Sequence, residues 1–324
     1  MRVTVLGTGA YGLALANMLN QNNNEIILWS KFEEEITYLQ KENKAKVLPN
    51  IKLTSNFKYT FNMKEAVNKS KLIIIAVPAG AVNEVSKQLA KYYKKDMHIC
   101  IASKGIEQNS CLFVSSVVEK YIKTKKLAVI SGGTFAIDMF NNCPLGLSLA
   151  TRNKNTSLIV KEALENKYLK LRTTNDIIGI EICGSIKNVI AIASGMLSGL
   201  GYPDSTSCMF ITESLNDIKN LIKALGGNKK TILSFAGFGD LLLTCTSTKS
   251  RNYTLGKMIG ERKPKEEIDN YINNTTIEGL YTLKSIYKLL RRKKVKMPII
   301  DLIYNIIFKE TDPDKLASFL ITKD

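Results

Sequence analysis

Glycines at positions 7, 9 and 12 form the pattern with the clearest chemical meaning in this chain. They stand in Gly7-Thr-Gly-Ala-Tyr-Gly12, a G-x-G-x-x-G between an apolar run at 1–6 and a helix-forming stretch at 13–19. A strand, a glycine turn and a helix in this order bind the pyrophosphate of a dinucleotide. Gly7 permits the tight turn, Gly9 lets phosphates approach the backbone at the helix N-terminus, and Gly12 lets helix and strand pack closely. The alternative is an ordinary strand–helix turn.

Lys187 lies within the long apolar segment 178–197, which reads as one helix beginning after Asn175 or Asp176. At helical spacing its face is apolar and small, and includes Ile180, Cys183, Gly184, Ala191 and Ser194. Such a lysine either extends its amine to solvent or is held in a cleft that the small residues leave open. In a cleft, its amine is suited to proton transfer.

Three further segments carry polar residues that suit a phosphorylated ligand. Lys104 directly follows a predicted strand, where ligands of parallel sheets bind, although an exposed loop lysine is the alternative. Asp240 follows two glycines and precedes three leucines, which predicts a helix cap. Ser250-Arg251-Asn252 opens another helix and offers a hydroxyl, a guanidinium and an amide to a phosphate. A simple cap with a surface arginine is the alternative there.

Length and composition narrow the class of protein. The 324 residues suffice for about two domains, and the 45% hydrophobic content supports full cores. The net charge of +17 comes from lysines spread along the chain, which indicates a solvated surface rather than a nucleic-acid or membrane-binding patch. We expect no signal peptide, no membrane-spanning run of about 18 apolar residues, and reduced thiols in a cytoplasmic protein. With one histidine and six scattered cysteines, no metal site is expected.

Short apolar strands alternate with helical patterns up to about residue 175. The strands are expected at 1–6, 25–29, 72–77, 98–102, 127–130 and 147–150, with helices such as 82–93 and 112–121 between them. This order predicts an α/β fold, a Rossmann-type doubly wound and mostly parallel sheet. After residue 178 the strand signals stop, and the rest of the chain is expected to be all-helical. We therefore predict a dinucleotide-binding domain at 1–177 and a helical substrate-binding and catalytic domain at 178–324.

The chain resembles the bacterial type of NAD(P)-dependent glycerol-3-phosphate dehydrogenase over nearly its whole length. The resemblance rests on segments in the right order: 7–12, Val47-Leu-Pro-Asn-Ile-Lys-Leu53, Ala76-Val-Pro78, Ser103-Lys-Gly-Ile-Glu107, Ser131-Gly-Gly-Thr-Phe-Ala136, Glu181-Ile-Cys-Gly-Ser-Ile-Lys-Asn-Val189, Gly237-Phe-Gly-Asp-Leu-Leu-Leu-Thr-Cys245, 250–252 and Glu278-Gly279. The combination of the lysine helix with the two later segments is specific.

The resemblance implies a role for each matching residue. Lys187 matches the catalytic lysine, the acid/base at the C2 oxygen of the substrate. The implied substrate contacts are Lys104, Gly132, Thr134, Lys187, Asp240, Ser250, Arg251 and Asn252. The implied cofactor contacts, beside Gly7, Gly9 and Gly12, are Ala10, Tyr11, Lys31, Lys104, Ala136, Arg251 and Glu278. Gly133 stands where the family usually has proline, so the loop that carries Gly132 and Thr134 lacks that ring's restriction here.

The end of the second strand lacks the acid that selects NAD by binding the ribose hydroxyls. Ser30 and Lys31 stand there instead, and Lys31 is expected to pair with a 2′-phosphate. Glu33, Glu34 and Glu35 come next, in the first turn of the following helix, where acids are favoured in any case. The cofactor is therefore NADPH or NADH, with NADPH expected to be accepted at least as well.

The resemblance implies the interconversion of dihydroxyacetone phosphate and sn-glycerol 3-phosphate, which supplies the backbone of phospholipids. The expected partners are a phosphorylated triose and a second copy in a homodimer, with no nucleic acid and no integral membrane segment. The alternatives are another Rossmann-plus-helical dehydrogenase of a hydroxy acid or sugar phosphate, and a basic nucleic-acid-binding protein. The former has no reason to carry Ser250-Arg251-Asn252, and the latter lacks a recognised binding module.

Overall fold

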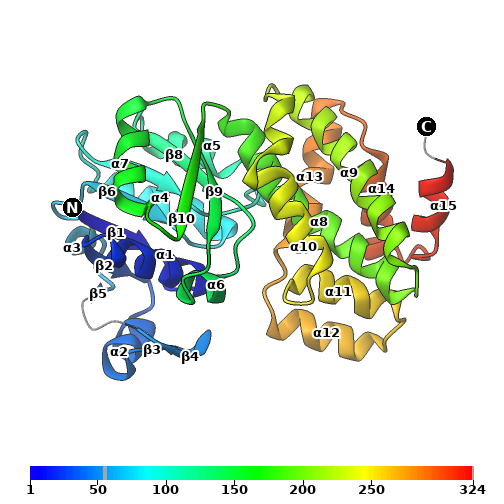
Figure 1. Cartoon of the computed structure of the whole chain (residues 1–324), viewed down its shortest axis with the longest axis horizontal. Helices are drawn as coiled ribbons and strands as arrows, with labels where there is room; N and C mark the ends of the chain where they lie inside the picture. The colour runs from blue at the N-terminus through cyan, green and yellow to red at the C-terminus, as the bar shows by residue number, and fades with distance from the viewer. Residues whose placement is uncertain (54–56, 323–324) are drawn as a thin grey trace. The chain divides into compact units, whose positions relative to one another are not determined.

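The computed structural model describes residues 1–53 and 57–322, and these divide into two compact units (Figure 1). Residues 1–104 and 113–177 form the first unit, and residues 105–112 join the part from 178 onward in the second. The predicted domain 1–177 includes 105–112, because a short irregular loop carries no sequence signal of the unit in which it packs. Residues 54–56 and 323–324 of the predicted domains lie outside the described residues.

An eight-stranded sheet forms the centre of the first unit, in the order β10-β9-β8-β7-β6-β1-β2-β5. Its strands are β1 (Arg2–Leu6), β2 (Glu25–Trp29), β5 (Lys58–Thr60), β6 (Leu72–Ile75), β7 (His98–Ile101), β8 (Leu127–Ser131), β9 (Leu145–Thr151) and β10 (Leu169–Thr174). All neighbours pair in parallel except β8 and β9, which are antiparallel. The predicted doubly wound, mostly parallel sheet is confirmed, with β5 and β10 as additional strands.

Register aligns the carboxyl ends of the three central strands beside the glycine turn. Leu6 at the end of β1 pairs with Trp29 of β2 on one side and with Ile75 of β6 on the other. The Gly7 amide then donates to the Trp29 carbonyl at 2.9 Å. All four residues of β6 are fully buried, as expected for a parallel strand covered on both faces. The turn is therefore anchored at the edge where such sheets bind ligands.

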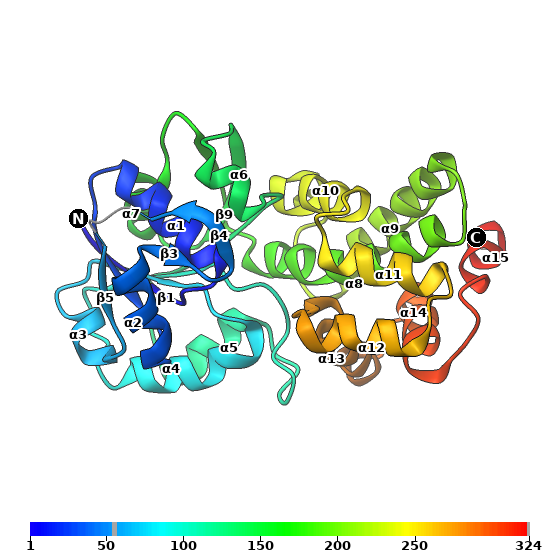
Figure 2. The ribbon, with the colours of Figure 1, turned by 90° about the horizontal axis from the view of Figure 1, so that it is seen from below.

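Helices cover both faces of this sheet, with α1, α6 and α7 on one face and α4 and α5 on the other (Figure 2). The helices of the first unit are α1 (Ala10–Gln21), α2 (Glu33–Glu42), α3 (Met63–Val67), α4 (Val82–Ala90), α5 (Val114–Tyr121), α6 (Ala136–Phe140) and α7 (Lys154–Leu164), with a 3₁₀ turn η1 (Ala79–Ala81). A small antiparallel ribbon, β3 (Lys44–Ala45) and β4 (Leu48–Lys52), follows α2.

The second unit contains helices and no strand within its described residues, as predicted. They are α8 (Ile177–Gly199), α9 (Asp204–Ala224), η2 (Lys229–Leu233), η3 (Phe235–Gly239), α10 (Asp240–Thr246), α11 (Arg251–Gly260), α12 (Lys265–Asn274), α13 (Glu278–Lys293), α14 (Pro298–Lys309) and α15 (Lys315–Thr322). η3 is a π-helix, with hydrogen bonds that span five residues.

Helices α8 and α11 approach each other closely through paired glycines. Gly195 and Gly199 of α8 lie one turn apart, as do Gly256 and Gly260 of α11. A Cβ at any of the four positions would overlap a backbone carbonyl oxygen of the other helix. Only glycine permits this separation, so the start of α11, with Ser250 before it, is held at a fixed distance from α8.

The length and apolar character of α8 follow from its place in the core of the second unit. It has 23 residues, and its most apolar window has a mean hydropathy of 1.6, which is sufficient to cross a membrane by length and composition alone. The helix is not an uninterrupted apolar run, because Glu181, Lys187 and Asn188 lie within it. Because 78% of that window is buried within the fold, its apolar side chains are accounted for by packing.

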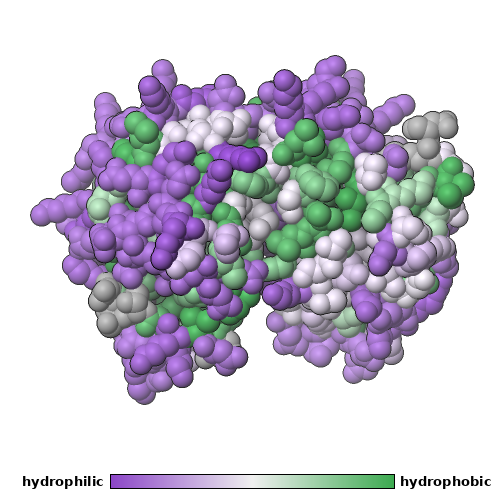
Figure 3. Space-filling view, in the orientation of Figure 1, coloured by the Kyte–Doolittle hydropathy of each residue, from purple (hydrophilic) through white to green (hydrophobic). Residues whose placement is uncertain are grey.

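The surface explains the high net charge. In the face of the molecule shown in Figure 3, hydrophilic residues are spread over each unit rather than gathered in one patch. Of the ion pairs in the described residues, most have half-exposed partners, such as Arg262 with Asp312 and Asp314. Exposed ion pairs contribute little to stability, so the main effect of the many lysines is a hydrated, positively charged surface.

Candidate active site

The glycine turn has the features that a dinucleotide phosphate requires. Gly7 adopts φ +121°, a conformation that favours glycine. A Cβ at Gly7 would overlap the Ala76 carbonyl oxygen, and a Cβ at Gly12 would overlap the Gly7 carbonyl oxygen. Gly9, in contrast, would direct a Cβ into open space in front of α1. The N-terminus of α1 has no side-chain cap and no acidic residue in its first turn. Its unsatisfied amides and positive dipole end therefore suit the pyrophosphate of NADH or NADPH.

Four of the residues that the sequence singled out cluster beside this turn. The Lys104 ammonium donates to the Gly132 carbonyl at 3.0 Å and lies 5.8 Å from the centre of the Tyr11 ring. The Thr134 hydroxyl is 3.4 Å from the Tyr11 hydroxyl. A Cβ at Gly132 would overlap the backbone of the neighbouring β9, so packing alone demands glycine there. Ala136, the first residue of α6, packs with Tyr11 against the same core.

The end of β2 is contacted by a carboxylate from α2, that of Glu35. Glu35 Oε2 accepts hydrogen bonds from the Thr8 hydroxyl and the Ser30 hydroxyl, each at 2.6 Å. Lys31 forms an exposed ion pair with Glu84, with its Nζ 3.2 Å from Glu84 Oε2. The available sequence signal was an acid in the first turn of the helix after β2, read only as a response to the helix dipole.

Lys187 is buried in the second unit and does not extend to solvent. Its side chain is 11% exposed, and its Nζ lies 2.6 Å from Asp240 Oδ1 and 2.9 Å from the Thr244 hydroxyl. The Thr244 hydroxyl also donates to the Asp240 carbonyl at 2.6 Å. Of the two alternatives for Lys187, the structure therefore shows the held amine. Its ammonium has a fixed position, a negative partner and a hydroxyl beside it.

The prediction that Asp240 caps a helix is wrong. Asp240 is the first residue within α10, and Gly239 occupies the cap position without a side-chain bond. The carboxylate instead turns to Lys187. A second contact fixes α10 against α8, because the Ser194 hydroxyl donates to the Cys245 carbonyl at 2.8 Å. Burial raises the pKa of the Cys245 thiol, which keeps it protonated and unreactive close to the lysine.

Ser250 and Arg251, at the start of α11, differ in their contacts. The Ser250 hydroxyl caps the helix by accepting from the Tyr253 amide at 3.3 Å, as expected for a serine there. Arg251 is exposed, and its guanidinium has no hydrogen bond or ion pair with any described residue. The Tyr271 hydroxyl donates to the Arg251 carbonyl at 3.3 Å. The start of α11 thus presents a cation beside the positive end of a helix, which suits a phosphate.

Both polar atoms of the Asn252 side chain are hydrogen-bonded within the protein, whereas the family resemblance implies a substrate contact. Its amide nitrogen donates to Asn188 Oδ1 at 3.1 Å, and its oxygen accepts from the Gly279 amide at 2.8 Å. Asn188 in turn donates to Glu278 Oε2 at 3.3 Å. The chain Glu278–Asn188–Asn252–Gly279 links α13, α8 and α11 next to Lys187. In this structure Asn252 therefore positions the helices, and a direct substrate contact would require its amide to exchange partners.

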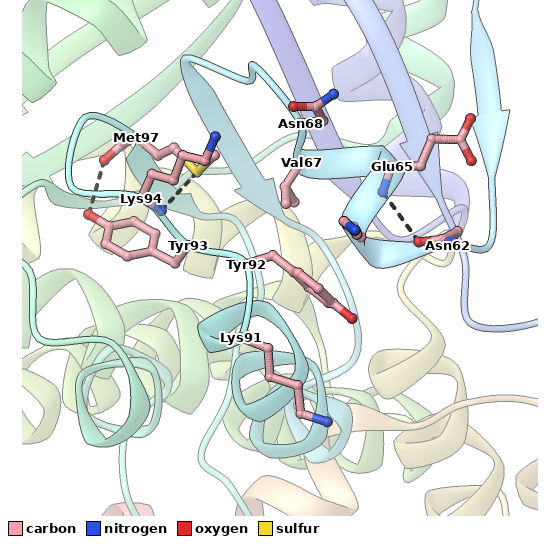
Figure 4. A pocket seen from close by; sticks show the side chains of 10 residues that line it. Asn62, Glu65, Val67, Asn68, Lys91, Tyr92, Tyr93, Lys94 and Met97 are labelled. Atoms are coloured by element: carbon pink, nitrogen blue, oxygen red, sulfur yellow. Dashed lines mark hydrogen bonds between the residues drawn. The ribbon is translucent and has the colours of Figure 1, made fainter.

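A hollow of about 510 Å³ lies elsewhere in the first unit and contains none of the predicted site residues (Figure 4). Segments that lead into β6 and β7 line it, with Lys64, Lys91, Lys94, Tyr92 and Tyr93 among them. The Tyr93 hydroxyl donates to the Met97 carbonyl at 3.1 Å within it. Among the described residues, no group of three His, Cys, Asp or Glu side chains could hold a metal ion.

Comparison with known proteins identifies the family of this chain. The family model for the N-terminus of NAD-dependent glycerol-3-phosphate dehydrogenase matches residues 2–157, and the model for its C-terminus matches residues 176–318. The chain belongs to the NAD-dependent glycerol-3-phosphate dehydrogenase family. The family resemblance in the sequence is confirmed, and membership makes the chain an oxidoreductase that uses NADH or NADPH.

Relatives of this dehydrogenase match along its whole length. The glycerol-3-phosphate dehydrogenase (NAD(P)+) of Staphylococcus epidermidis is 35% identical over 327 residues, covering 100% of this chain and 98% of the relative. That of Fusobacterium nucleatum is 33% identical, covering 100% and 97%. The crystal structure of glycerol-3-phosphate dehydrogenase from Coxiella burnetii superposes with a TM-score of 0.93 at 30% identity, covering 99% of each chain. The similarity therefore extends over both units of the chain.

Proposed function

We propose that this dehydrogenase reduces dihydroxyacetone phosphate to sn-glycerol 3-phosphate, reversibly, with Lys187 as the proton donor. The observation that carries the proposal is the buried ammonium of Lys187, held at 2.6 Å by Asp240 and at 2.9 Å by Thr244. A buried, fixed ammonium is a general acid with its donor direction set before substrate binds. Family membership and the relatives' names support the substrate.

The nicotinamide, when bound, supplies a hydride to the C2 carbonyl carbon, which is the chemistry of the cofactor. Lys187 gives its proton to the C2 oxygen, so the ketone becomes the secondary alcohol. The amine then regains a proton from solvent, and in the reverse direction it removes the proton from the alcohol. Asp240 keeps the ammonium in place and compensates its charge in a buried environment, where an unpaired charge would be costly.

Arg251 and Ser250 are the proposed phosphate contacts. The Arg251 guanidinium has no protein partner among the described residues, and the dipole of α11 adds positive potential beside it. Asn252, Lys104, Gly132 and Thr134 are proposed to contribute further substrate contacts, as the family resemblance implies. Lys104 also has the position of a cofactor contact, because it lies over Tyr11 next to the glycine turn.

The remaining cofactor contacts are proposed for Gly7, Gly9, Ala10, Tyr11, Gly12, Lys31, Ala136, Arg251 and Glu278. The open space in front of Gly9 and the uncapped N-terminus of α1 support the pyrophosphate position. We propose residues 1–177 as the dinucleotide-binding domain and residues from 178 onward as the catalytic domain. The product would feed phospholipid synthesis in the cytoplasm, and a homodimer is the proposed assembly.

The test is oxidation of NADH and of NADPH by the purified protein with dihydroxyacetone phosphate. We expect one sn-glycerol 3-phosphate per cofactor oxidised, identified by a stereospecific assay. A panel of 2-oxo acids and other sugar phosphates is the control, and we expect kcat/KM at least a hundredfold lower for each. Turnover of a 2-oxo acid instead would contradict the substrate assignment and favour a hydroxy-acid dehydrogenase on the same fold.

A further inference from the structure

The glycine turn and the end of β2 are joined by one carboxylate, that of Glu35. Its Oε2 accepts from Thr8, which lies within the turn, and from Ser30, which directly follows β2. In a doubly wound sheet the adenine ribose of a dinucleotide lies between these two segments, and an acid at the end of the second strand binds its hydroxyls. Glu35 reaches the same location from the first turn of α2.

We propose that Glu35 reads the 2′ position of the adenine ribose and makes the enzyme prefer NADH to NADPH. This rests on the proposed function only in that the enzyme uses a nicotinamide dinucleotide. It differs from the sequence-based expectation that NADPH is accepted at least as well. Glu35 Oε1 has no partner among the described residues, and it is therefore the acceptor for the ribose 2′-hydroxyl of NADH.

The charge around this carboxylate opposes a 2′-phosphate. No Lys or Arg of the described residues lies within ion-pair distance of Glu35, and Glu33 and Glu34 precede it in the same turn of α2. A 2′-phosphate carries close to two negative charges, so it would be repelled by the Glu35 carboxylate that faces the glycine turn and the end of β2. The helix dipole of α2 offsets only part of this repulsion.

Lys31 is poorly suited to compensate. Its ammonium lies 3.2 Å from Glu84 Oε2 and 5.1 Å from the centre of the Phe32 ring. To bind a 2′-phosphate it would exchange a partner that it already has, and an exposed lysine pair contributes little in water. Lys31 at the end of β2 thus already has a carboxylate partner, whereas Glu35 has no cationic partner among the described residues.

Binding of two fragments that cannot react tests the proposal without turnover. ADP-ribose and its 2′-phosphorylated form differ only at the position in question, and calorimetry gives the Kd of each. We expect the unmodified protein to bind ADP-ribose at least tenfold more tightly. In Glu35→Gln this ratio should fall at least fivefold, because the amide oxygen still accepts from Thr8 and Ser30 but the charge is gone. Glu34→Gln, on the same turn, is the matched control and should keep the ratio.

Three outcomes would overturn the proposal. They are equal or tighter binding of the 2′-phosphorylated fragment, an equal weakening of both fragments in Glu35→Gln, and a Lys31→Ala variant that selectively loses the phosphorylated fragment. An equal weakening would mean that Glu35 only supports the turn. The ratio of kcat/KM for NADH and NADPH should follow the binding ratio. If the fragments behave as expected but dihydroxyacetone phosphate is not reduced, the proposed substrate fails and the assignment of Glu35 stands.

Discussion

Replacing Lys187 with methionine should affect stability and catalysis separately, because the lysine is both a buried charge and the proposed proton donor. With side chains 11% and 2% exposed, Lys187 and Asp240 form a buried ion pair. Removing one partner leaves the other charge buried and unpaired, at a cost of about 3–5 kcal/mol. We expect this loss in Lys187→Met and a comparable one in Asp240→Asn. Lys187→Met with Asp240→Asn should recover at least about 2 kcal/mol, because neither charge remains.

Activity should not recover with stability. Without the proton donor, kcat should fall by about 10²–10⁴-fold in Lys187→Met and in the double variant alike. Affinity for NADH should change less than about twofold, since the glycine turn is untouched. Lys288→Met, at an exposed position of α13, is the control, and it should leave both kcat and the free energy of unfolding nearly unchanged.

Urea unfolding followed by far-UV circular dichroism reports on the helices of both units, and fluorescence of Trp29, the single tryptophan, reports on the first unit alone. The coupling energy is the difference between the double variant and the sum of the single variants. Additive losses would refute the buried ion pair. Near-normal turnover by folded Lys187→Met would refute its role as the acid.

Three further predictions follow from other contacts. Arg251→Ala should raise the KM for dihydroxyacetone phosphate at least tenfold, whereas the slow reaction with dihydroxyacetone should be insensitive, and equal effects on both would argue against a phosphate contact. Gly9→Ala should fold normally but weaken NADH binding, because its Cβ would enter the space in front of α1. Gly12→Ala should lower the melting temperature, because its Cβ would overlap the Gly7 carbonyl. Titration calorimetry with NADH and scanning calorimetry of both variants distinguish the two effects. Burial lowers the pKa of His98 to about 4 from 6.5, so the unfolded chain takes up the proton first as pH falls. Stability should therefore fall between pH 6.5 and 4 by up to about 3 kcal/mol, and urea midpoints of His98→Leu should lack this part of the decline.

The sequence predicts the strands that are continuous apolar runs but not those held by their neighbours. Strand β6 is recognisable because all four of its residues are apolar and buried. Strand β10 (Leu169–Thr174) alternates buried leucines with exposed Lys170 and Arg172, so it forms through its register with β9 rather than through its own composition. Strand β5 has three residues and depends equally on β2.

The same distinction applies to the site. Lys187 and Asp240 are conspicuous in the sequence, because one is a lysine within an apolar helix and the other an acid next to two glycines, whereas Glu35 is indistinguishable from any acid in a first helical turn. Their partners were not predictable, because Lys187 and Asp240 are 53 positions apart and Glu35 meets Thr8 across 27. Side-chain direction at the start of a helix decides whether an acid caps that helix or contacts another element. That direction depends on tertiary packing, which spacing along the chain does not contain.

The π-helix η3 has a consequence for insertions and deletions. A π turn accommodates one residue more than an α turn, and Phe235–Gly239 runs directly into Asp240. Deleting one residue there would let the segment relax to ordinary α-helix and rotate everything after it by about 100° relative to what precedes it. Asp240 would then turn away from Lys187 although every side chain of the pair was still encoded. The length of Phe235–Gly239 therefore decides, together with the identity of the two residues, whether Asp240 meets Lys187.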